Sequence, residues 1–402
     1  MHAANFVLPL ITLPYLVRVL GTEYFGLVVF AQSLAMLFHV LVEFGLDLSA
    51  TREISIHRNN QKKINELFSS VYVIKAALAL LSFLLLALLV FQIPKLREDW
   101  EIYLLSFGIV VGQAIFPLWY FQGMERMKLI SWIQVAAKAI FTVLVLLLIR
   151  RSDDFLLVPV FQAIGFSVAG TAGLFLAMKG VHLTFPDLRE TKKLFRESAQ
   201  LFVSNISSSM YTYSNVLILG AFTNSSIVGI FSSMEKLVLA VKTAYTPIFQ
   251  TLFPHVSRKS GRDIIRFTQR LVLPLFLIGL SIATVLILFA GPILDLLYAD
   301  ASINQYNQVL QILGGISLFA ALSMLFNLLF LTAMKKYRVR MRIMLFTGTV
   351  HLVLAIILTK WYGIYGMAWA AVFAELLLLL LGTYQFNRIN HEETGTGTNG
   401  RS

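Results

Sequence analysis

Twelve apolar runs cover most of the chain, and short segments rich in polar and charged residues separate them. Each run is long enough to cross roughly 30 Å of hydrocarbon as a helix. The pattern therefore predicts an all-α polytopic membrane protein with about twelve transmembrane helices. The expected limits of the helices are residues 3–20, 25–47, 71–91, 102–121, 131–149, 155–178, 199–221, 226–253, 268–291, 306–332, 342–359 and 363–384.

The first run is the weakest of the twelve. It holds only about 15 residues before Arg18, which is short for a membrane-spanning helix. Either the sequence begins inside a longer helix, or this helix starts at the very terminus.

Lys and Arg concentrate in every second segment between the runs. Segments after even-numbered runs, together with the carboxy-terminal tail, hold 23 of the 33 Lys and Arg residues. Segments after odd-numbered runs hold six. Cytoplasmic loops of membrane proteins carry such an excess of cations, so the alternation predicts that both termini lie in the cytoplasm.

The composition agrees with a membrane protein and excludes several function classes. Of the 402 residues, 57% are hydrophobic and 13% are charged, whereas a soluble domain carries about 25% charged residues. The net charge of +12 reflects loop orientation and some affinity for anionic lipid, so no nucleic-acid partner is expected. The chain has no Cys, and its seven His show no paired spacing. We therefore expect no disulfide, metal site or cofactor.

Two segments of the chain resemble two later segments. Residues 116–128 align with residues 326–338 at an offset of 210 without a gap, and Leu20-Gly21 echoes Leu219-Gly220. Parallel repeats of this kind build transporters with a cavity between two lobes. The predicted parts are a six-helix lobe (1–180), a basic cytoplasmic linker (181–197), a six-helix lobe (198–387) and a disordered cytoplasmic tail (388–402).

Eight charged residues fall in or near the predicted spans, where a functional role is the default hypothesis. Lys242 lies near the middle of the run 226–253, so we expect it to line a cavity. Glu235 lies seven residues earlier on nearly the same helix face, and could line the same wall. The eight residues are Glu43, Asp47, Lys75, Lys138, Glu235, Lys236, Lys242 and Glu375.

Simpler explanations exist for several buried polar residues. Lys75 lies one turn inside its run, so its ammonium group could reach the cytoplasmic headgroups. Glu375 is expected to be a structural partner for a hydroxyl or a cation. His39 and His351 are expected to be core histidines with satisfied hydrogen bonds.

Several stretches of the chain carry a resemblance to a known family. The chain resembles the bacterial O-antigen (Wzx-type) flippases, polysaccharide transporters of the multidrug/oligosaccharidyl-lipid/polysaccharide exporter superfamily. The resemblance implies a multi-pass protein of the bacterial inner membrane that is a transporter and not an enzyme. The stretches are Asn5–Gly21, Tyr24–Gly26, Phe44–Glu53, Phe116–Met127, Leu252–Pro254 and Gly363–Glu375.

The substrate implied by the resemblance is an oligosaccharide unit on undecaprenyl pyrophosphate. Such a flippase would move it from the cytoplasmic to the periplasmic leaflet by alternating access. Its expected partners are this lipid-linked oligosaccharide, membrane lipids, a polysaccharide polymerase and a chain-length regulator.

A pyrophosphate and a sugar headgroup need cations and hydrogen-bond donors. Six charged residues are therefore candidate substrate-binding residues, and polar side chains of the run 199–221 are candidate sugar contacts. The charged candidates are Arg18, Asp47, Arg52, Lys138, Glu235 and Lys242; the polar ones are Ser204, Asn205, Ser207, Ser208, Ser209, Tyr211, Tyr213 and Asn215.

The carboxylates Glu43 and Asp47 lie one helical turn apart at the end of the second run. One hypothesis is that they hold cavity cations such as Lys242 while no substrate is bound. The alternative is an ion pair between Asp47 and Arg52 that fixes the end of the helix.

Three other function classes can be weighed against the sequence. A drug/cation antiporter of the same superfamily would want an acidic cavity, but the spans hold at least as many cations as acids. A lipid II-type flippase is closer in chemistry and would, by resemblance, have more than twelve spans. A membrane polymerase or ligase would, by resemblance, carry a large periplasmic loop that this sequence lacks.

Overall fold

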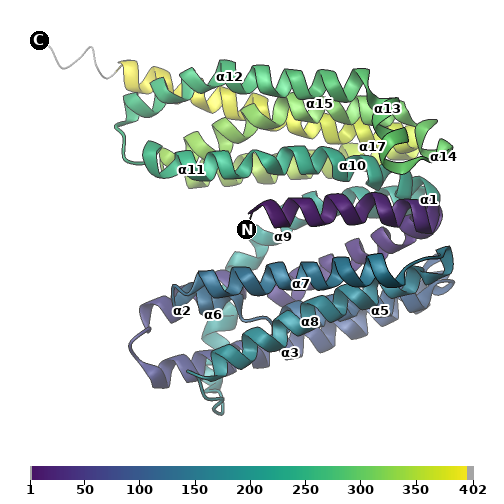
Figure 1. Ribbon diagram of the computed structural model, residues 1–402. Helices are drawn as coiled ribbons and strands as arrows, with labels where there is room; N and C mark the ends of the chain where they lie inside the picture. The colour runs from purple at the N-terminus through teal and green to yellow at the C-terminus, as the bar shows by residue number, and fades with distance from the viewer. Residues whose placement is uncertain (1, 396–402) are drawn as a thin grey trace, which may run out of the picture. The chain divides into compact units, whose positions relative to one another are not determined.

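The structure is a computed structural model that describes residues 2–395, except the side chains of residues 2–7, 9, 10, 129, 203–212, 394 and 395. The described chain is almost entirely helical and contains no strand. It forms two compact units, Met1–Tyr213 and Ser214–Ser402. The first unit contains α1 (His2–Glu43), α2 (Leu46–Ile56), α3 (Gln61–Gln92), α4 (Pro94–Arg97), α5 (Trp100–Ile115), α6 (Leu118–Gly123), α7 (Met127–Leu148), η1 (Ser152–Leu156), α8 (Leu157–Met178) and most of α9 (Leu188–Phe222) (Figure 1).

The second unit begins within α9 and ends with the longest helix of the chain. The η2 segment in this unit is π-helical. Its elements are α10 (Ser225–Ala244), α11 (Thr246–Val256), α12 (Gly261–Leu288), α13 (Ala290–Tyr298), α14 (Ala301–Asn304), α15 (Asn307–Met324), η2 (Leu325–Phe330), α16 (Leu331–Ala333) and α17 (Tyr337–Gly395).

The helices confirm an all-α polytopic membrane protein. Eight helical stretches among the described residues are long and apolar enough to cross a membrane. Two of these stretches, in α1 and α17, each contain a break in the helix, at Gly21 (φ 73°) and Gly363 (φ 56°). Each break divides one stretch into two predicted spans, and α9 and the α10–α11 pair account for the rest of the twelve.

Several span limits differ from those predicted by the hydrophobic pattern. The helix expected over 25–47 ends at Glu43, because Phe44 and Gly45 have positive φ angles of 46° and 74°. The helix expected over 102–121 is interrupted before Pro117, since the residue before a proline is driven to extended backbone; Phe116 has φ −73° and ψ 115°. The helix expected over 226–253 divides into α10 and α11 beside Pro247.

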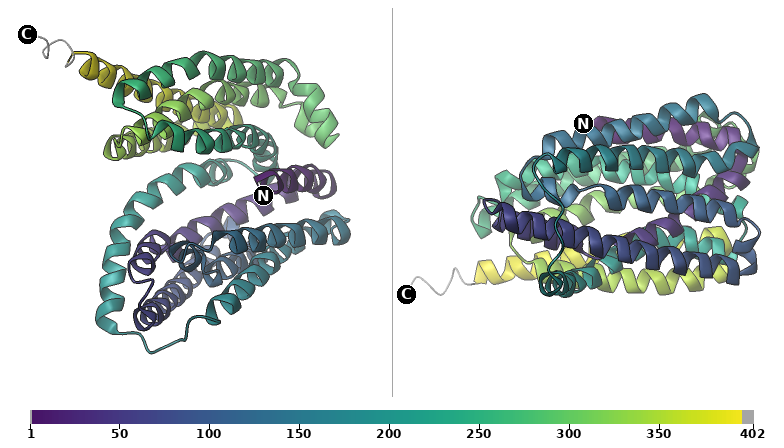
Figure 2. Two further views of the ribbon diagram at one scale, coloured as in Figure 1. Left: turned by 60° about the vertical axis from the view of Figure 1, so that its left-hand side comes forward. Right: turned by 90° about the horizontal axis from the view of Figure 1, so that it is seen from below.

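The helices of each unit divide into central and lipid-facing ones. In an apolar 18-residue segment of α3 and of α12, 28% and 22% of the residues are buried. In such a segment of Asn307–Ala333, which comprises α15, η2 and α16, 67% are buried. Leu is the most frequent of the large hydrophobic residues exposed on α3 and α12, as expected for surfaces in contact with lipid tails. In the second unit, α15 packs against α10, α12 and α17, and Figure 2 shows these helices running alongside one another from two further sides.

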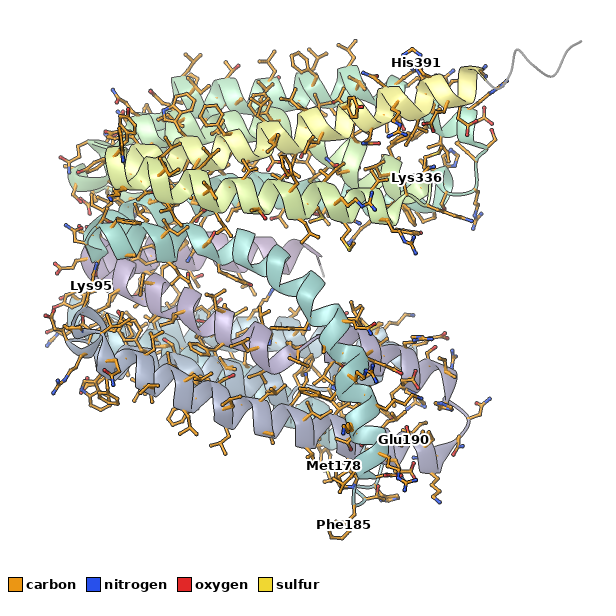
Figure 3. The ribbon with its side chains drawn as sticks, turned by 180° about the vertical axis from the view of Figure 1, so that it is seen from behind. Lys95, Met178, Phe185, Glu190, Lys336 and His391 are labelled. Carbon is orange, nitrogen blue, oxygen red and sulfur yellow. The ribbon has the colours of Figure 1, made fainter. Side chains whose placement is uncertain are left out.

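Within the first unit, the ends of the helices agree with the predicted alternation. Figure 3 shows Lys95, which follows α3, at one end of this unit, and Met178 and Glu190 at the other end. In the second unit, Lys336 and His391 lie at the same end as each other. The predicted limits of the lobes, linker and tail stay a prediction; the structure shows that residues 179–187 join α8 to α9 without a helix.

Candidate functional site

The first unit contains a buried cluster of charges at the junction of α1, α2 and α3. Lys75 of α3 donates to Oε1 of Glu43 at 2.9 Å, and its Nζ lies 3.6 Å from Oδ1 of Asp47. His39, one turn before Glu43 on α1, lies 3.5 Å from the same Glu43 oxygen. The side chain of Lys75 is only 2% exposed. We name these four residues the Lys75 cluster.

The backbone between α1 and α2 explains why both carboxylates reach one ammonium group. The left-handed Phe44 and Gly45 turn the chain, so that Asp47 begins a new helix beside the end of α1. A side chain at position 45 would not fit, because a Cβ there would lie 2.7 Å from the carbonyl oxygen of Ser198 on α9. Next to this contact, the hydroxyls of Ser49 and Ser198 are hydrogen-bonded at 2.6 Å.

The Lys75 cluster corrects two expectations from the sequence. Lys75 was expected to extend to the headgroups, but it is buried against Glu43 and Asp47. Asp47 faces Lys75, and in the part of the chain that the structure describes Arg52 is exposed and forms no ion pair with it. The hypothesis that Glu43 and Asp47 hold Lys242 stays a prediction; within their own units, Glu43 pairs with Lys75 and Lys242 pairs with Glu375.

Lys242 is paired inside the second unit. Its Nζ donates to Oε2 of Glu375 at 2.5 Å, and the hydroxyl of Ser323 bonds the other carboxylate oxygen. Glu375 is 1% exposed, whereas Lys242 is 24% exposed. Glu375 thus has both a hydroxyl and a cation as partners, as the sequence predicted. The three residues join α10, α17 and α15.

Glu235 belongs to a second polar network of the same unit. The Asn215 amide donates to Oε1 of Glu235 at 2.6 Å, and Nε2 of His351 lies 2.7 Å from Oδ1 of Asn215. Nδ1 of His351 lies 3.3 Å from the carbonyl oxygen of Ala370. The prediction that His351 is a satisfied core histidine is confirmed, and it is 1% exposed.

The six predicted charged residues are divided between the two units, and each is described within its own unit. Glu235 and Lys242 lie on one helix but in different networks, and Asp47 lies in the Lys75 cluster. Arg18 is exposed on α1, and Lys138 is half-buried on α7. Of the predicted sugar contacts, the side chains of Ser204, Asn205, Ser207, Ser208, Ser209 and Tyr211 lie outside the described residues.

Several residues of these networks were not among the predicted site residues. Lys75 was assigned to the surface because of its place in the run. Asn327 of η2 donates from its side-chain amide to the carbonyl oxygen of Ser323 on α15 at 3.0 Å. Both residues carried no signal beyond being polar in an apolar stretch. A polar residue in the middle of a span needs a partner. Ser323 and Asn327 are four positions apart, so they lie on the same face of the helix.

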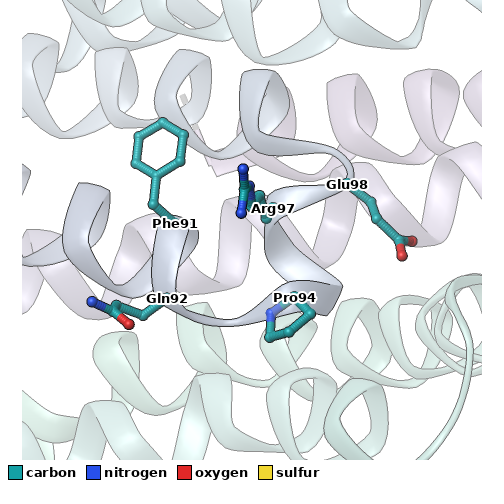
Figure 4. A pocket seen from close by; sticks show the side chains of 5 residues that line it. All are labelled: Phe91, Gln92, Pro94, Arg97 and Glu98. Carbon is teal, nitrogen blue, oxygen red and sulfur yellow. The ribbon is translucent and has the colours of Figure 1, made fainter.

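Two surface pockets lie away from these networks. One pocket of about 350 Å³ lies at the turn between α3 and α4, where Phe91, Gln92, Pro94, Arg97 and Glu98 line it (Figure 4). Another, of about 550 Å³, surrounds α14. Among the described residues, no group of three or more His, Asp or Glu could hold a metal ion.

Comparison with known proteins identifies the family. Residues 1–260 match the model of a family described as polysaccharide biosynthesis protein. This chain belongs to that family. Two relatives of the chain carry the name "Putative O-antigen transporter": one from Shigella dysenteriae is 29% identical over 94% of this chain and 96% of its own length. The other, from Escherichia coli strain K12, is 24% identical over 94% of this chain and 92% of its own length.

Solved structures show which fold the family member adopts. The lipid II flippase MurJ in an inward closed conformation superimposes with a TM-score of 0.76, at 14% identity over 96% of this chain and 89% of its own. A multidrug resistance MATE family transporter of the MOP superfamily, in an inward-facing conformation, gives 0.66 at 15% identity over 95% of both chains. At these identities the likeness shows the fold, which is the two-lobe fold expected from the repeat.

Proposed function

We propose that this protein moves an oligosaccharide linked to undecaprenyl pyrophosphate from the cytoplasmic to the periplasmic leaflet of the bacterial inner membrane. The observation that carries the proposal is the match of 94% of the chain to two proteins named as O-antigen transporters. The coarser conclusion is that the chain is a multi-pass membrane transporter of a polysaccharide biosynthesis family and not an enzyme. The lipid carrier, the direction and the alternating-access mechanism belong to the proposal.

The buried lysines support an anionic substrate. A lysine at the centre of a membrane helix costs about 2.5–3.5 kcal/mol by insertion scales, so each one must be compensated. Lys75 and Lys242 are compensated by carboxylates, and a pyrophosphate can replace a carboxylate as partner of an ammonium group. Lys242 is 24% exposed and Lys75 is 2% exposed. Lys242 is therefore the better candidate for exchanging Glu375 for a phosphate.

The other predicted residues have supporting roles in the proposal. Arg18, Arg52 and Lys138 would attract the phosphates, and Asp47 would keep Lys75 charged and in place. Undecaprenyl chains are as apolar as the exposed leucines of α3 and α12, so the lipid part can stay in the bilayer. A polysaccharide polymerase and a chain-length regulator would act on the unit after its release.

The orientation of the chain is also part of the proposal. The excess of Lys and Arg in alternate loops supports cytoplasmic termini. The basic loops would then lie on the side where the lipid-linked unit is made, and their charge would attract its pyrophosphate and anionic lipids.

The test is translocation in sealed vesicles that contain the purified protein and a fluorescent lipid-linked oligosaccharide. We expect the oligosaccharide to become accessible to a membrane-impermeant enzyme added on the opposite side, and protein-free vesicles to show no such change. Parallel assays with lipid II and with a cationic dye represent the two rival transport functions. Transport of the dye, without transport of either lipid, would contradict the proposal.

A further inference from the structure

The polar residues around Asn215 form a network that α9, α10 and α17 share. Asn215 lies near the end of α9, Glu235 on α10, and His351 and Ala370 on opposite sides of the Gly363 break in α17. Three contacts join them in a row, from Glu235 to Asn215 at 2.6 Å, from Asn215 to His351 at 2.7 Å, and from His351 to the Ala370 carbonyl at 3.3 Å. We name Glu235, Asn215 and His351 the Asn215 trio.

The groups at the two ends of this row, Glu235 and the Ala370 carbonyl, determine which atoms of Asn215 and His351 must carry hydrogens. The carbonyl oxygen of Ala370 can only accept, so Nδ1 of His351 must carry a hydrogen. The amide of Asn215 has one donor end and one acceptor end. With its NH2 group toward Glu235, its oxygen faces Nε2 of His351, which must then also carry a hydrogen. The histidine is then a cation, and Glu235 is a carboxylate.

The opposite orientation of the amide leads to the same proton count. Its oxygen then faces Glu235, which must be protonated to donate to it. Its NH2 group donates to Nε2 of His351, which is then neutral. In both orientations the Asn215 trio holds one proton more than a carboxylate and a neutral histidine would hold, and its net charge is zero.

Removal of that proton breaks one contact of the row in either orientation. Two acceptor lone pairs would then face each other in one of the three contacts: between His351 and the Ala370 carbonyl, between Asn215 and His351, or between Glu235 and Asn215. The loss of a hydrogen bond within this row is costly because the row is buried: His351 and Asn215 are 1% and 8% exposed. A second proton would leave a positive charge inside a membrane span.

The charges around the Asn215 trio come from α10 and α17. Lys236 follows Glu235 directly, and the Lys242–Glu375 pair lies further along the same two helices. Lys360 lies on α17 near the break, and Tyr298 of α13 donates to the carbonyl of Ser233, two residues before Glu235. The α9 residues of this unit and the whole of α15 carry no charged residue.

We propose that the Asn215 trio is a binding site for one proton, which is held only while α9, α10 and both halves of α17 are packed together. Movement of α17 relative to α9 or α10 separates the members of the row and releases the proton. The site itself does not depend on the substrate. The further step, that this proton is exchanged during transport, rests on the proposed function.

The test counts the protons that detergent-solubilised protein releases when the buffer changes from mildly acidic to mildly alkaline. The variants are Glu235→Gln, His351→Gln and the double variant. A glutamine at either position can supply the missing donor or acceptor without a titrating proton. We therefore expect each single variant to release one proton fewer than the unsubstituted protein, and the double variant to release no fewer than either single variant.

The matched control combines Glu235→Gln with a substitution of an exposed histidine, His391→Gln. The losses of two independent groups add, so this pair is expected to lose as many protons as its two single variants lose together. A single variant of the trio that releases as many protons as the unsubstituted protein would overturn the proposal, and so would additive losses in the trio double variant. Where one variant does not fold, the other single variant still gives the count.

Transport is measured separately on the same variants. With a pH gradient across sealed vesicles, we expect the rate of lipid-linked oligosaccharide translocation to change in the unsubstituted protein and not in Glu235→Gln. An equal response of both would remove the proton from the transport cycle. If the proton counts agree with the proposed site but no translocation is seen, the proton-binding site is supported and the proposed function is contradicted.

Discussion

Glu125 and Lys335, 210 positions apart, have the same left-handed backbone, with φ angles of 58° and 56°. The hydrogen bonds around the two residues are also the same. The amide of Arg126 donates to Phe121 and that of Lys336 donates to Leu331, both at 2.8 Å. The next helix begins at Met127 in one unit and at Tyr337 in the other, again 210 positions apart. The two units therefore repeat one turn in atomic detail.

This turn gives a prediction about stability. A β-branched residue is strongly disfavoured at positive φ, so Glu125→Val and Lys335→Val should each destabilise the protein by about 1–2 kcal/mol. The expected result is a lower temperature of unfolding in detergent, measured by intrinsic fluorescence. Lys335→Gly should be neutral or slightly stabilising, since glycine adopts this backbone without a steric penalty.

The control for this prediction is the neighbouring substitution Lys336→Val, whose backbone has no positive φ. It should change the unfolding temperature much less than Lys335→Val. Equal effects at the two positions would mean that the left-handed backbone is not what sets the stability of the turn.

The Lys75 cluster gives a second prediction. Lys75→Ala should lower the amount of protein in the membrane and its unfolding temperature, because it leaves Glu43 and Asp47 without their buried cation. Breaking one partner of a buried pair costs about 3–5 kcal/mol. The triple variant Lys75→Met, Glu43→Gln, Asp47→Asn removes the charges together and should recover most of the abundance.

Abundance is measured by quantitative immunoblotting of membranes. Arg52→Ala is the matched control, since Arg52 is an exposed cation near the same helix junction. Normal abundance of Lys75→Ala would show that the buried pairing contributes little to stability.

The sequence predicted the helices well because lipid imposes a simple pattern on them. Every span must be apolar and hydrogen-bonded within itself, so the twelve runs and the repeat at residues 116–128 were visible. The second proposed match failed in its detail, since Gly21 has a positive φ angle whereas Gly220 lies inside α9. Short motifs in an apolar chain can match by composition alone. The longer alignment, of residues 116–128 with residues 326–338, contains the turn that both units share.

The partners of the charged residues could not be predicted in the same way. Lys75 and Glu43 are 32 positions apart, and Lys242 and Glu375 are 133 positions apart. Which residues meet depends on how the helices rotate and on breaks such as Phe44-Gly45. The hydrophobic pattern does not record those breaks, so Asp47 was assigned to Arg52 or to a distant lysine.

The orientation of the chain gives a third prediction. Reporter fusions after Arg58, Lys193, Lys259 and Arg340 should report the cytoplasm, because the cations that favour this side lie there. Fusions near Lys95, Asp153 and Asp300 should report the periplasm. Paired alkaline phosphatase and green fluorescent protein fusions measure both outcomes. A cytoplasmic signal at Asp300 would contradict the count of twelve spans.

The last prediction separates two roles of Lys242. If the lysine only compensates Glu375, then the double variant Lys242→Met, Glu375→Gln should keep both abundance and transport, because it removes the buried charges together. If Lys242 also binds a substrate phosphate, the double variant should accumulate normally and lose most of its transport.

Single variants sharpen this comparison. Lys242→Arg keeps the charge and should keep much of the transport, whereas Lys242→Glu should be the worst, since it repels both Glu375 and a pyrophosphate. The measurement is the amount of O-antigen oligosaccharide displayed on the surface of cells that lack their own flippase. The amount of the variant protein is determined in the same cells. Because Glu375 is almost fully buried, Lys242→Ala is expected to reduce abundance as well as display, and display per molecule is the quantity to compare. Full display per molecule in both Lys242→Ala and the double variant would show that the ammonium group of Lys242 serves Glu375 and not the substrate.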